Sequence, residues 1–168
     1  AEYYSYDNFG NVSAFLNASG GATYYAYDKL NRRTAAAYPD DTAHYFAYDP
    51  ASNMTSTQDA RGFCYFSYDA LNRLTSERQP NGVEVGHEYD AVGRRTALTC
   101  GDAATYYSYD PAGRMSSAIP ADPQLAATYY EFDDAGRLVM RVTGDVYHTY
   151  FAYDDAGRTT SIMHRLNS

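Results

Sequence analysis

The sequence predicts an all-β protein, a single curved or spiralling antiparallel meander of about eight β-hairpins. Three observations predict this fold: an aspartate that returns at a nearly fixed spacing, aromatic rings that alternate with small residues before it, and turn-forming residues at constant positions after it. The composition agrees with a sheet, because the chain has 20 Tyr and 7 Phe but no Trp, and tyrosine favours pleated, half-buried surfaces.

The repeat is marked by an aspartate that returns every 20 to 23 residues. A short fixed period of this kind is typical of arrays in which each unit packs against its neighbours. The copies extend along the whole chain, so we expect one array over residues 1–168 and no second domain. The aspartates that mark the turns are Asp7, Asp28, Asp49, Asp69, Asp90, Asp110, Asp133 and Asp154.

A strand is expected to end at each of these aspartates. A ring stands directly before the aspartate, a second ring or a histidine stands two residues earlier, and the residue between them is Ser, Ala or Glu. Such a period of two places the rings on one face of a strand. The rings nearest the turns are Tyr6, Tyr27, Tyr48, Tyr68, Tyr89, Tyr109, Phe132 and Tyr153.

The residues after each aspartate predict a tight hairpin turn. The third position holds residues that tolerate positive φ, mostly Gly or Asn, with Ser52 as the weakest case. An aspartate that opens a type I turn, followed by a left-handed residue, makes a three-residue hairpin loop with a β-bulge. The glycines at this position are Gly10, Gly93, Gly113, Gly136 and Gly157, and the asparagines are Asn31 and Asn72.

The same loop sets each aspartate opposite the residue four positions later. This residue is arginine in six units and asparagine, Asn11 or Asn53, in two. We expect exposed Asp–Arg pairs that specify the register more than they stabilise the sheet. The arginines are Arg32, Arg73, Arg94, Arg114, Arg137 and Arg158.

Between hairpins the chain is expected to return through looser turns, such as Pro80-Asn81-Gly82. Equivalent rings of successive hairpins should then lie at similar heights and form ladders of ring-on-ring contacts. Open twisted sheets rarely exceed roughly 10 strands without curling, so a meander of about 16 strands must bend or spiral.

The segments Tyr107-Ser-Tyr-Asp-Pro-Ala-Gly-Arg114 and Phe151-Ala-Tyr-Asp-Asp-Ala-Gly-Arg158 resemble the YD repeat of the Rhs family. The resemblance covers the entire chain. It implies the spiralling β-sheet shell of bacterial Rhs proteins, of the C component of ABC-type toxin complexes and of teneurins, which in the bacterial members encloses a toxic C-terminal domain. The family's self-cleavage signature is not seen, because Asp49-Pro50 and Asp110-Pro111 continue within the repeat turn, so no protease activity is carried over.

No residue pattern predicts catalysis, a cofactor site or a metal site, so we do not expect an enzyme. The repeat aspartates are explained by their turns and their arginine partners. The two cysteines, Cys64 and Cys100, are expected to be free thiols on strands about three apart. The histidines fall in unrelated registers, with His87 in a ring position; they are His44, His87, His148 and His164.

The expected partners follow from charge and resemblance. A net charge of -8 argues against nucleic acid, and no run of about 18 apolar residues predicts membrane insertion. No targeting signal is expected in the chain as given, and the resemblance implies a secreted or cell-surface bacterial location. Further YD repeats and an enclosed toxin domain are the implied partners. The alternative is a carbohydrate-binding cell-surface module that stacks sugars on exposed tyrosines.

The size of the array predicts association. A guest domain of about 100 residues needs a wall roughly 140 Å around, whereas about 16 strands spaced ~4.8 Å apart supply ~77 Å. Exposed strand edges at both ends favour continuation or joining. We therefore expect either an internal segment of a larger shell or a unit that joins end to end into a tube or filament.

Overall fold

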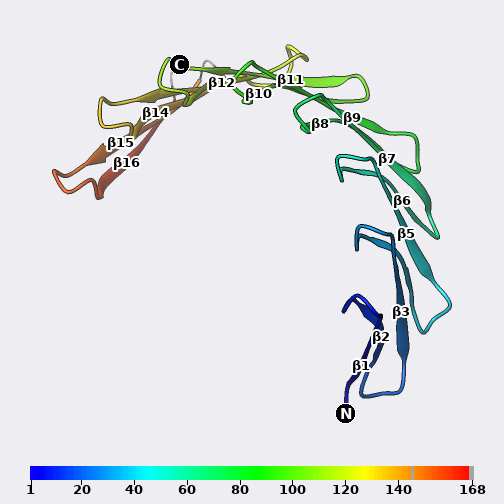
Figure 1. The fold of residues 1–168 in the computed structure, drawn as a ribbon. Helices are drawn as coiled ribbons and strands as arrows, with labels where there is room; N and C mark the ends of the chain where they lie inside the picture. Colours follow the sequence, from blue (N-terminus) through cyan, green and yellow to red (C-terminus); the bar gives the residue numbers. More distant parts are fainter. Residues whose placement is uncertain (145, 167–168) are drawn as a thin grey trace. The chain divides into compact units, whose positions relative to one another are not determined.

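A computed structural model describes residues 1–144 and 146–166 of the chain. Within these residues there are sixteen β-strands and no helix. The described part therefore contains no helix that could cross a membrane. The strands follow one another in chain order (Figure 1), and the chain falls into two compact units, residues 1–84 and 85–168.

The first unit is a meander of four hairpins. Each strand pairs antiparallel with the strand that follows it, from β1 to β8. In Figure 1 this unit runs from blue to green. Its strands are β1 (Tyr3–Tyr6), β2 (Val12–Leu16), β3 (Ala22–Tyr27), β4 (Arg33–Ala37), β5 (Ala43–Tyr48), β6 (Met54–Asp59), β7 (Gly62–Tyr68) and β8 (Leu74–Arg78).

The second unit repeats this arrangement with four more hairpins, again paired antiparallel in chain order. The predicted all-β hairpin meander is thereby confirmed. The strands of this unit are β9 (Glu84–Tyr89), β10 (Arg95–Cys100), β11 (Ala103–Tyr109), β12 (Met115–Pro120), β13 (Thr128–Phe132), β14 (Leu138–Thr143), β15 (Tyr147–Tyr153) and β16 (Thr159–Leu166).

The predicted hairpin turn is confirmed in detail. In the β3–β4 hairpin the N–H of Asp28 donates to the carbonyl of Arg32 at 2.9 Å, and the N–H of Asn31 donates to the carbonyl of Asp28 at 3.0 Å. The register shifts by one residue between Ala26 and Tyr27, which is the expected bulge. The third residue after the repeat aspartate has positive φ in all eight hairpins, at 58° to 88°, and this includes Ser52.

The return turns between hairpins are tighter than the sequence predicts. Three of them, at residues 17–21, 38–42 and 79–83, have the same two backbone hydrogen bonds as the aspartate turns. Gly20, Asp41 and Gly82 take the left-handed position in these turns. The expectation of a looser turn at Pro80-Asn81-Gly82 is therefore wrong, because the Gly82 N–H closes the loop onto the carbonyl of Gln79 at 2.9 Å.

Neither unit has an ordinary hydrophobic core. Among the described residues the buried hydrophobic side chains are Ala36 and Ala97, and no large side chain is fully buried. Each unit is thus a single layer of sheet whose larger side chains are half-buried or exposed. In such an array, cohesion comes from the contacts that each hairpin makes with the next.

Candidate functional site

The repeat aspartate organises each hairpin turn with its carboxylate. In the β3–β4 hairpin, Oδ1 of Asp28 accepts hydrogen bonds from the N–H groups of Leu30 and Arg32, at 2.9 and 3.0 Å. The pKa of Asp28 lies below its ordinary value, chiefly because the backbone N–H of Arg32 donates to it, and the Arg32 side chain adds to the shift. The carboxylate is therefore a fully used structural acceptor, as a turn-opening Asp should be.

The second carboxylate oxygen binds the arginine four residues later. The Nε–Oδ2 distance is 2.6 to 2.7 Å in all six arginine units. In five units the arginine side chain is only 20 to 35% exposed, whereas that of Arg158 is 81% exposed. The expectation of exposed pairs is wrong for those five, and in four of them a ring of the next hairpin covers the guanidinium.

Four of the half-buried arginines reach over the ring that precedes the next repeat aspartate. The guanidinium carbon lies 4.6 to 4.8 Å from the ring centre in the pairs for which a contact is found, a distance typical of a cation–π interaction. These pairs are Arg32–Tyr48, Arg94–Tyr109, Arg114–Phe132 and Arg137–Tyr153.

The guanidinium also binds the backbone of the next turn. Nη1 of Arg32 donates to the carbonyl of Asp49 at 2.8 Å, and Nη1 of Arg114 donates to the carbonyl of Asp133 at 3.2 Å. One arginine therefore joins its own aspartate, the next ring and the next turn. We call this set of contacts a rung.

The rungs replace the ring-on-ring ladders that the sequence predicts. The ring pairs found among the described residues, such as Tyr4–Phe15 and Phe63–Tyr65, do not join equivalent positions of successive hairpins. Equivalent rings are two strands apart, or about 9.6 Å, which exceeds the 4.5–7 Å of ring contacts. An arginine from the intervening strand fills this gap. The prediction of ring-on-ring contacts between successive hairpins is therefore wrong, because arginine–ring contacts take their place.

A tyrosine hydroxyl completes the rung from the opposite side. The hydroxyl of Tyr27 donates to the carbonyl of Val12 on the preceding hairpin at 3.0 Å, and that of Tyr153 donates to the carbonyl of Leu138 at 2.8 Å. Tyr48, Tyr68 and Tyr109 make the equivalent bond. The sequence shows that these positions carry rings, but not that tyrosine is preferred there for its hydroxyl.

Asparagine forms a shorter rung in the two units that lack arginine. Nδ2 of Asn11 donates to Asp7 at 2.9 Å and to Oδ1 of Asn31 on the next hairpin at 3.0 Å. Nδ2 of Asn53 likewise donates to Asp49 at 2.9 Å and to Oδ1 of Asn72 at 2.8 Å. The third position after an aspartate therefore takes part in contacts between hairpins as well as in its own turn.

The other face of each strand carries a row of exposed tyrosines, four residues before the repeat aspartates. By the alternation of a strand these side chains point away from the rungs. Successive members lie two strands apart, or about 9.6 Å. They are Tyr3, Tyr24, Tyr45 and Tyr65 in the first unit and Tyr106 and Tyr129 in the second.

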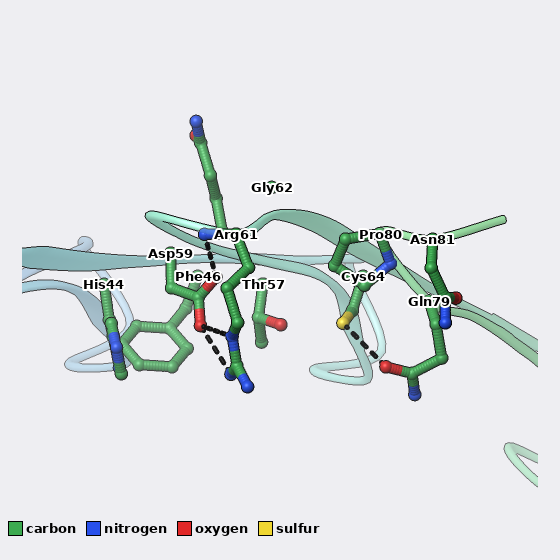
Figure 2. A pocket seen from close by; sticks show the side chains of 11 residues that line it. His44, Phe46, Thr57, Asp59, Arg61, Gly62, Cys64, Gln79, Pro80 and Asn81 are labelled. Atoms are coloured by element: carbon green, nitrogen blue, oxygen red, sulfur yellow. Dashed lines mark hydrogen bonds and ion pairs between the residues drawn. The ribbon is translucent and has the colours of Figure 1, made fainter. Parts of the chain in front are cut away.

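A hollow of about 540 Å³ lies in the first unit near the ends of β5, β6 and β7. Figure 2 shows Asp59 bound to Arg61 on one side and Cys64 facing Gln79 on the other, with an Sγ–Oε1 distance of 3.6 Å. The pKa of Asp59 lies below its ordinary value because the Arg61 side chain donates a hydrogen bond to it. These paired groups form a polar surface suited to hydrogen bonding rather than a nucleophile with its base.

The residues considered for other chemistry do not converge. Cys64 is half-buried and Cys100 is exposed, and both are free thiols. His164 Nδ1 lies 3.1 Å from the hydroxyl of Thr149, and His44 packs edge-on against Tyr38. Within residues 1–144 and 146–166 no group of three or more His, Cys, Asp or Glu side chains could hold a metal ion.

Part of the chain matches a known repeat family. Residues 68–105 match the sequence model of the RHS Repeat, which extends over two of the aspartate turns described above. No curated protein matches the chain. The six hairpins outside the matched segment have the same ring and aspartate positions, and four of them also have the arginine.

Solved structures share the fold at low sequence identity. A Tc holotoxin pore of Photorhabdus luminescens that carries a TccC3 mutation matches 88% of this chain with a TM-score of 0.76 and 15% identity. The TcdB2-TccC3 crystal structure matches 96% of it with a TM-score of 0.79 and 15% identity. The chain spans only 9% and 10% of those chains, so the likeness concerns a segment of much longer proteins.

Proposed function

Because this chain is built of Rhs/YD repeats, we propose that it is a non-catalytic structural segment of an Rhs-like protein and forms part of a β-walled shell, tube or filament around a partner. The observation that carries the proposal is the rung. Half-buried Arg–Asp–ring contacts or Asn–Asn hydrogen bonds join each hairpin to the next within both units, while no large side chain is fully buried in the described residues. Such an array gains cohesion from length rather than from a core.

The enclosed partner is proposed to be a toxic domain of the same protein or of its complex. Support comes from the fold likeness to chains of a Tc holotoxin pore and of TcdB2-TccC3. The same likeness supports a secreted or cell-surface bacterial location. Labelling of intact cells with an antibody to the repeats, against lysed cells as the control, tests the location; signal only after lysis contradicts it.

Limited proteolysis of the complete protein tests enclosure. A domain behind the wall should stay uncut at low urea and become sensitive when the wall unfolds. The matched variant is Arg114→Ala, which removes one rung outside any guest domain and should shift cleavage of the guest to lower urea. Cleavage of the guest at a urea concentration that does not follow the unfolding of the repeats contradicts enclosure.

Self-association is proposed for the isolated segment, because strands β1 and β16 have exposed side chains throughout and lie at the edges of their units. Tyr6, on β1, is 61% exposed. Light scattering of the 168-residue chain should show a mass that rises with concentration. A monomer that stays soluble at high concentration contradicts end-to-end joining.

A carbohydrate-binding surface is the second candidate, favoured by the exposed tyrosine row. Rings spaced about 9.6 Å apart beside hydroxyl-rich strands could stack on the sugars of an extended glycan. Triple substitution of Tyr24, Tyr45 and Tyr65 by Ala should abolish retention on a polysaccharide column. The matched control is Tyr27→Phe, which removes a rung hydroxyl on the other face, and equal retention of all three proteins contradicts this candidate.

A further inference from the structure

Two kinds of rung differ in which side chain spans the gap between hairpins. In the arginine rung the long side chain crosses the gap alone. In the asparagine rung two short amides meet, because Asn11 ends 3.0 Å from Asn31. The residue at the third position after the aspartate of the following hairpin also differs between the two kinds of rung.

The third position of the following hairpin is Gly or Ser wherever an arginine precedes it. A Cβ atom built on Gly113 would lie 3.6 Å from Nη1 of Arg94, and one built on Gly136 would lie 3.6 Å from Nη1 of Arg114. At these two positions a side chain longer than one carbon would therefore meet the guanidinium. Ser52 is short enough to be accommodated, and its hydroxyl accepts a hydrogen bond from Arg32 Nη1 at 3.2 Å.

The following hairpin fills this space wherever an asparagine precedes it. Asn11 is followed by Asn31 and Asn53 by Asn72, and both pairs are hydrogen-bonded. Asparagine also tolerates the positive φ of these positions, 58° and 60°. The lengths of the two side chains that face each other across the gap are thus complementary in the rungs of both units: a long one faces a short one, or two of intermediate length meet.

We propose that the residue four after each repeat aspartate selects the hairpin that can lie next to it. Arginine accepts a hairpin with Gly or Ser at the third position, and asparagine accepts a hairpin with Asn there. By this rule the surface around Arg158, whose side chain is 81% exposed, fits a further hairpin of the Gly/Ser class with a ring before its aspartate. Only this last step rests on the proposed role as a segment of a longer wall.

A pair of substitutions in the full chain tests the rule. Gly136→Asn introduces a tolerated left-handed residue against the guanidinium of Arg114, so the thermal midpoint should fall by about 2–4 °C. The matched control is Gly10→Asn, where φ is similarly positive but no arginine rung precedes the hairpin in this chain and a Cβ would meet nothing within 4 Å. Equal midpoints for the two variants would overturn steric selection.

Exchange of the whole rung gives the stronger test. Arg114→Asn with Gly136→Asn should recover most of the loss shown by Gly136→Asn alone, because an Asn–Asn bond replaces the clash. Asn11→Arg with Asn31→Gly should recover the loss of Asn11→Arg in the same way. If the two changes add without coupling at both sites, the rule is wrong.

An appended hairpin tests the surface around Arg158. A second copy of residues 148–166, joined directly after Ser168, places its aspartate 21 residues after Asp154. In this longer chain Arg158→Ala should lower the thermal midpoint by about 2–4 °C, and in the 168-residue chain it should not. An equal fall of the thermal midpoint in both chains overturns the docking surface around Arg158. Failure of the rung exchanges overturns the selection rule itself. Neither result depends on what the wall encloses.

Discussion

The guanidinium of Arg114 lies 4.6 Å from the centre of the Phe132 ring on the next hairpin, while its Nε binds Asp110 at 2.6 Å. One side chain therefore couples two successive hairpins at positions where their backbones are not hydrogen-bonded to each other. This contact occurs in both units, and four of the predictions below follow from it or from the turn that supports it.

Removal of a covered arginine should destabilise the array more than removal of the exposed one. Arg114→Ala loses a half-buried ion pair and a cation–π contact, for a cost of about 1–2 kcal/mol. Arg158→Ala should cost only a few tenths of a kcal/mol, as at an exposed pair. Urea unfolding followed by circular dichroism measures both, and equal losses would show that the ring contact contributes nothing.

A hydroxyl should strengthen the rung that lacks one. Phe132 occupies a position where other hairpins have tyrosine, and the equivalent acceptor is the carbonyl of Met115. Phe132→Tyr should raise the free energy of unfolding by about 0.5–1.5 kcal/mol, the usual net value of a hydrogen bond. The reverse change, Tyr153→Phe, should lower the free energy of unfolding by a similar amount. A fall for Phe132→Tyr, or a rise for Tyr153→Phe, would contradict the role of the hydroxyl.

A β-branched residue should be tolerated beside the left-handed position but not in it. Gly136 has a φ of +81°, so Gly136→Val should cost roughly 1–3 kcal/mol. Ala135→Val, one residue earlier and exposed, should cost little. Unfolding midpoints in urea compare the two, and equal values would place the strain elsewhere in the turn.

Acid should weaken the array through its turn aspartates. The pKa of Asp28 is held below 3.8, first by the Arg32 backbone N–H, and the pKa of Asp69 is lowered in the same way by Arg73. A carboxyl group whose pKa is lower in the folded state contributes stability above its unfolded pKa and loses it as the pH falls through the folded value. The urea midpoint should therefore be level from about pH 7 to 5 and fall below about pH 4.

A control variant isolates the turn contribution. Asp28→Asn with Asp69→Asn should reduce the acid-induced fall in the midpoint, because two groups that lose stabilising bonds on protonation are already neutral. An unchanged slope would assign the acid sensitivity to other carboxylates.

The hairpin turns could be predicted from sequence because they obey local rules. Asp at the start, a type I core and a left-handed residue are all within four positions, and even Ser52 follows the pattern with a φ of 69°. The six Asp–Arg pairs follow from the same loop geometry. Such contacts need no knowledge of what lies beyond the hairpin.

The rungs could not be predicted in the same way, because they depend on two hairpins at once. The columns show arginine after the turn and a ring before the next one, but only the spacing of about 9.6 Å between equivalent strands explains why Arg137 and not another ring lies against Tyr153. The half-burial of the ion pairs follows from this contact. The tight return turns were missed for a simpler reason, since Gly20 and Gly82 carry the same glycine signal as the aspartate turns.

Within each unit the strands lie in the sheet in the same order as in the chain, and this has a mechanical consequence. A pull on the first or last strand of a unit loads its ladder of hydrogen bonds one after another, as in unzipping, instead of all together. Since each rung joins a hairpin only to its neighbour, the resistance renews with every hairpin released. Such a sheet withstands heat and denaturant collectively, yet a motor that draws the polypeptide from one end would meet a series of small, evenly spaced barriers.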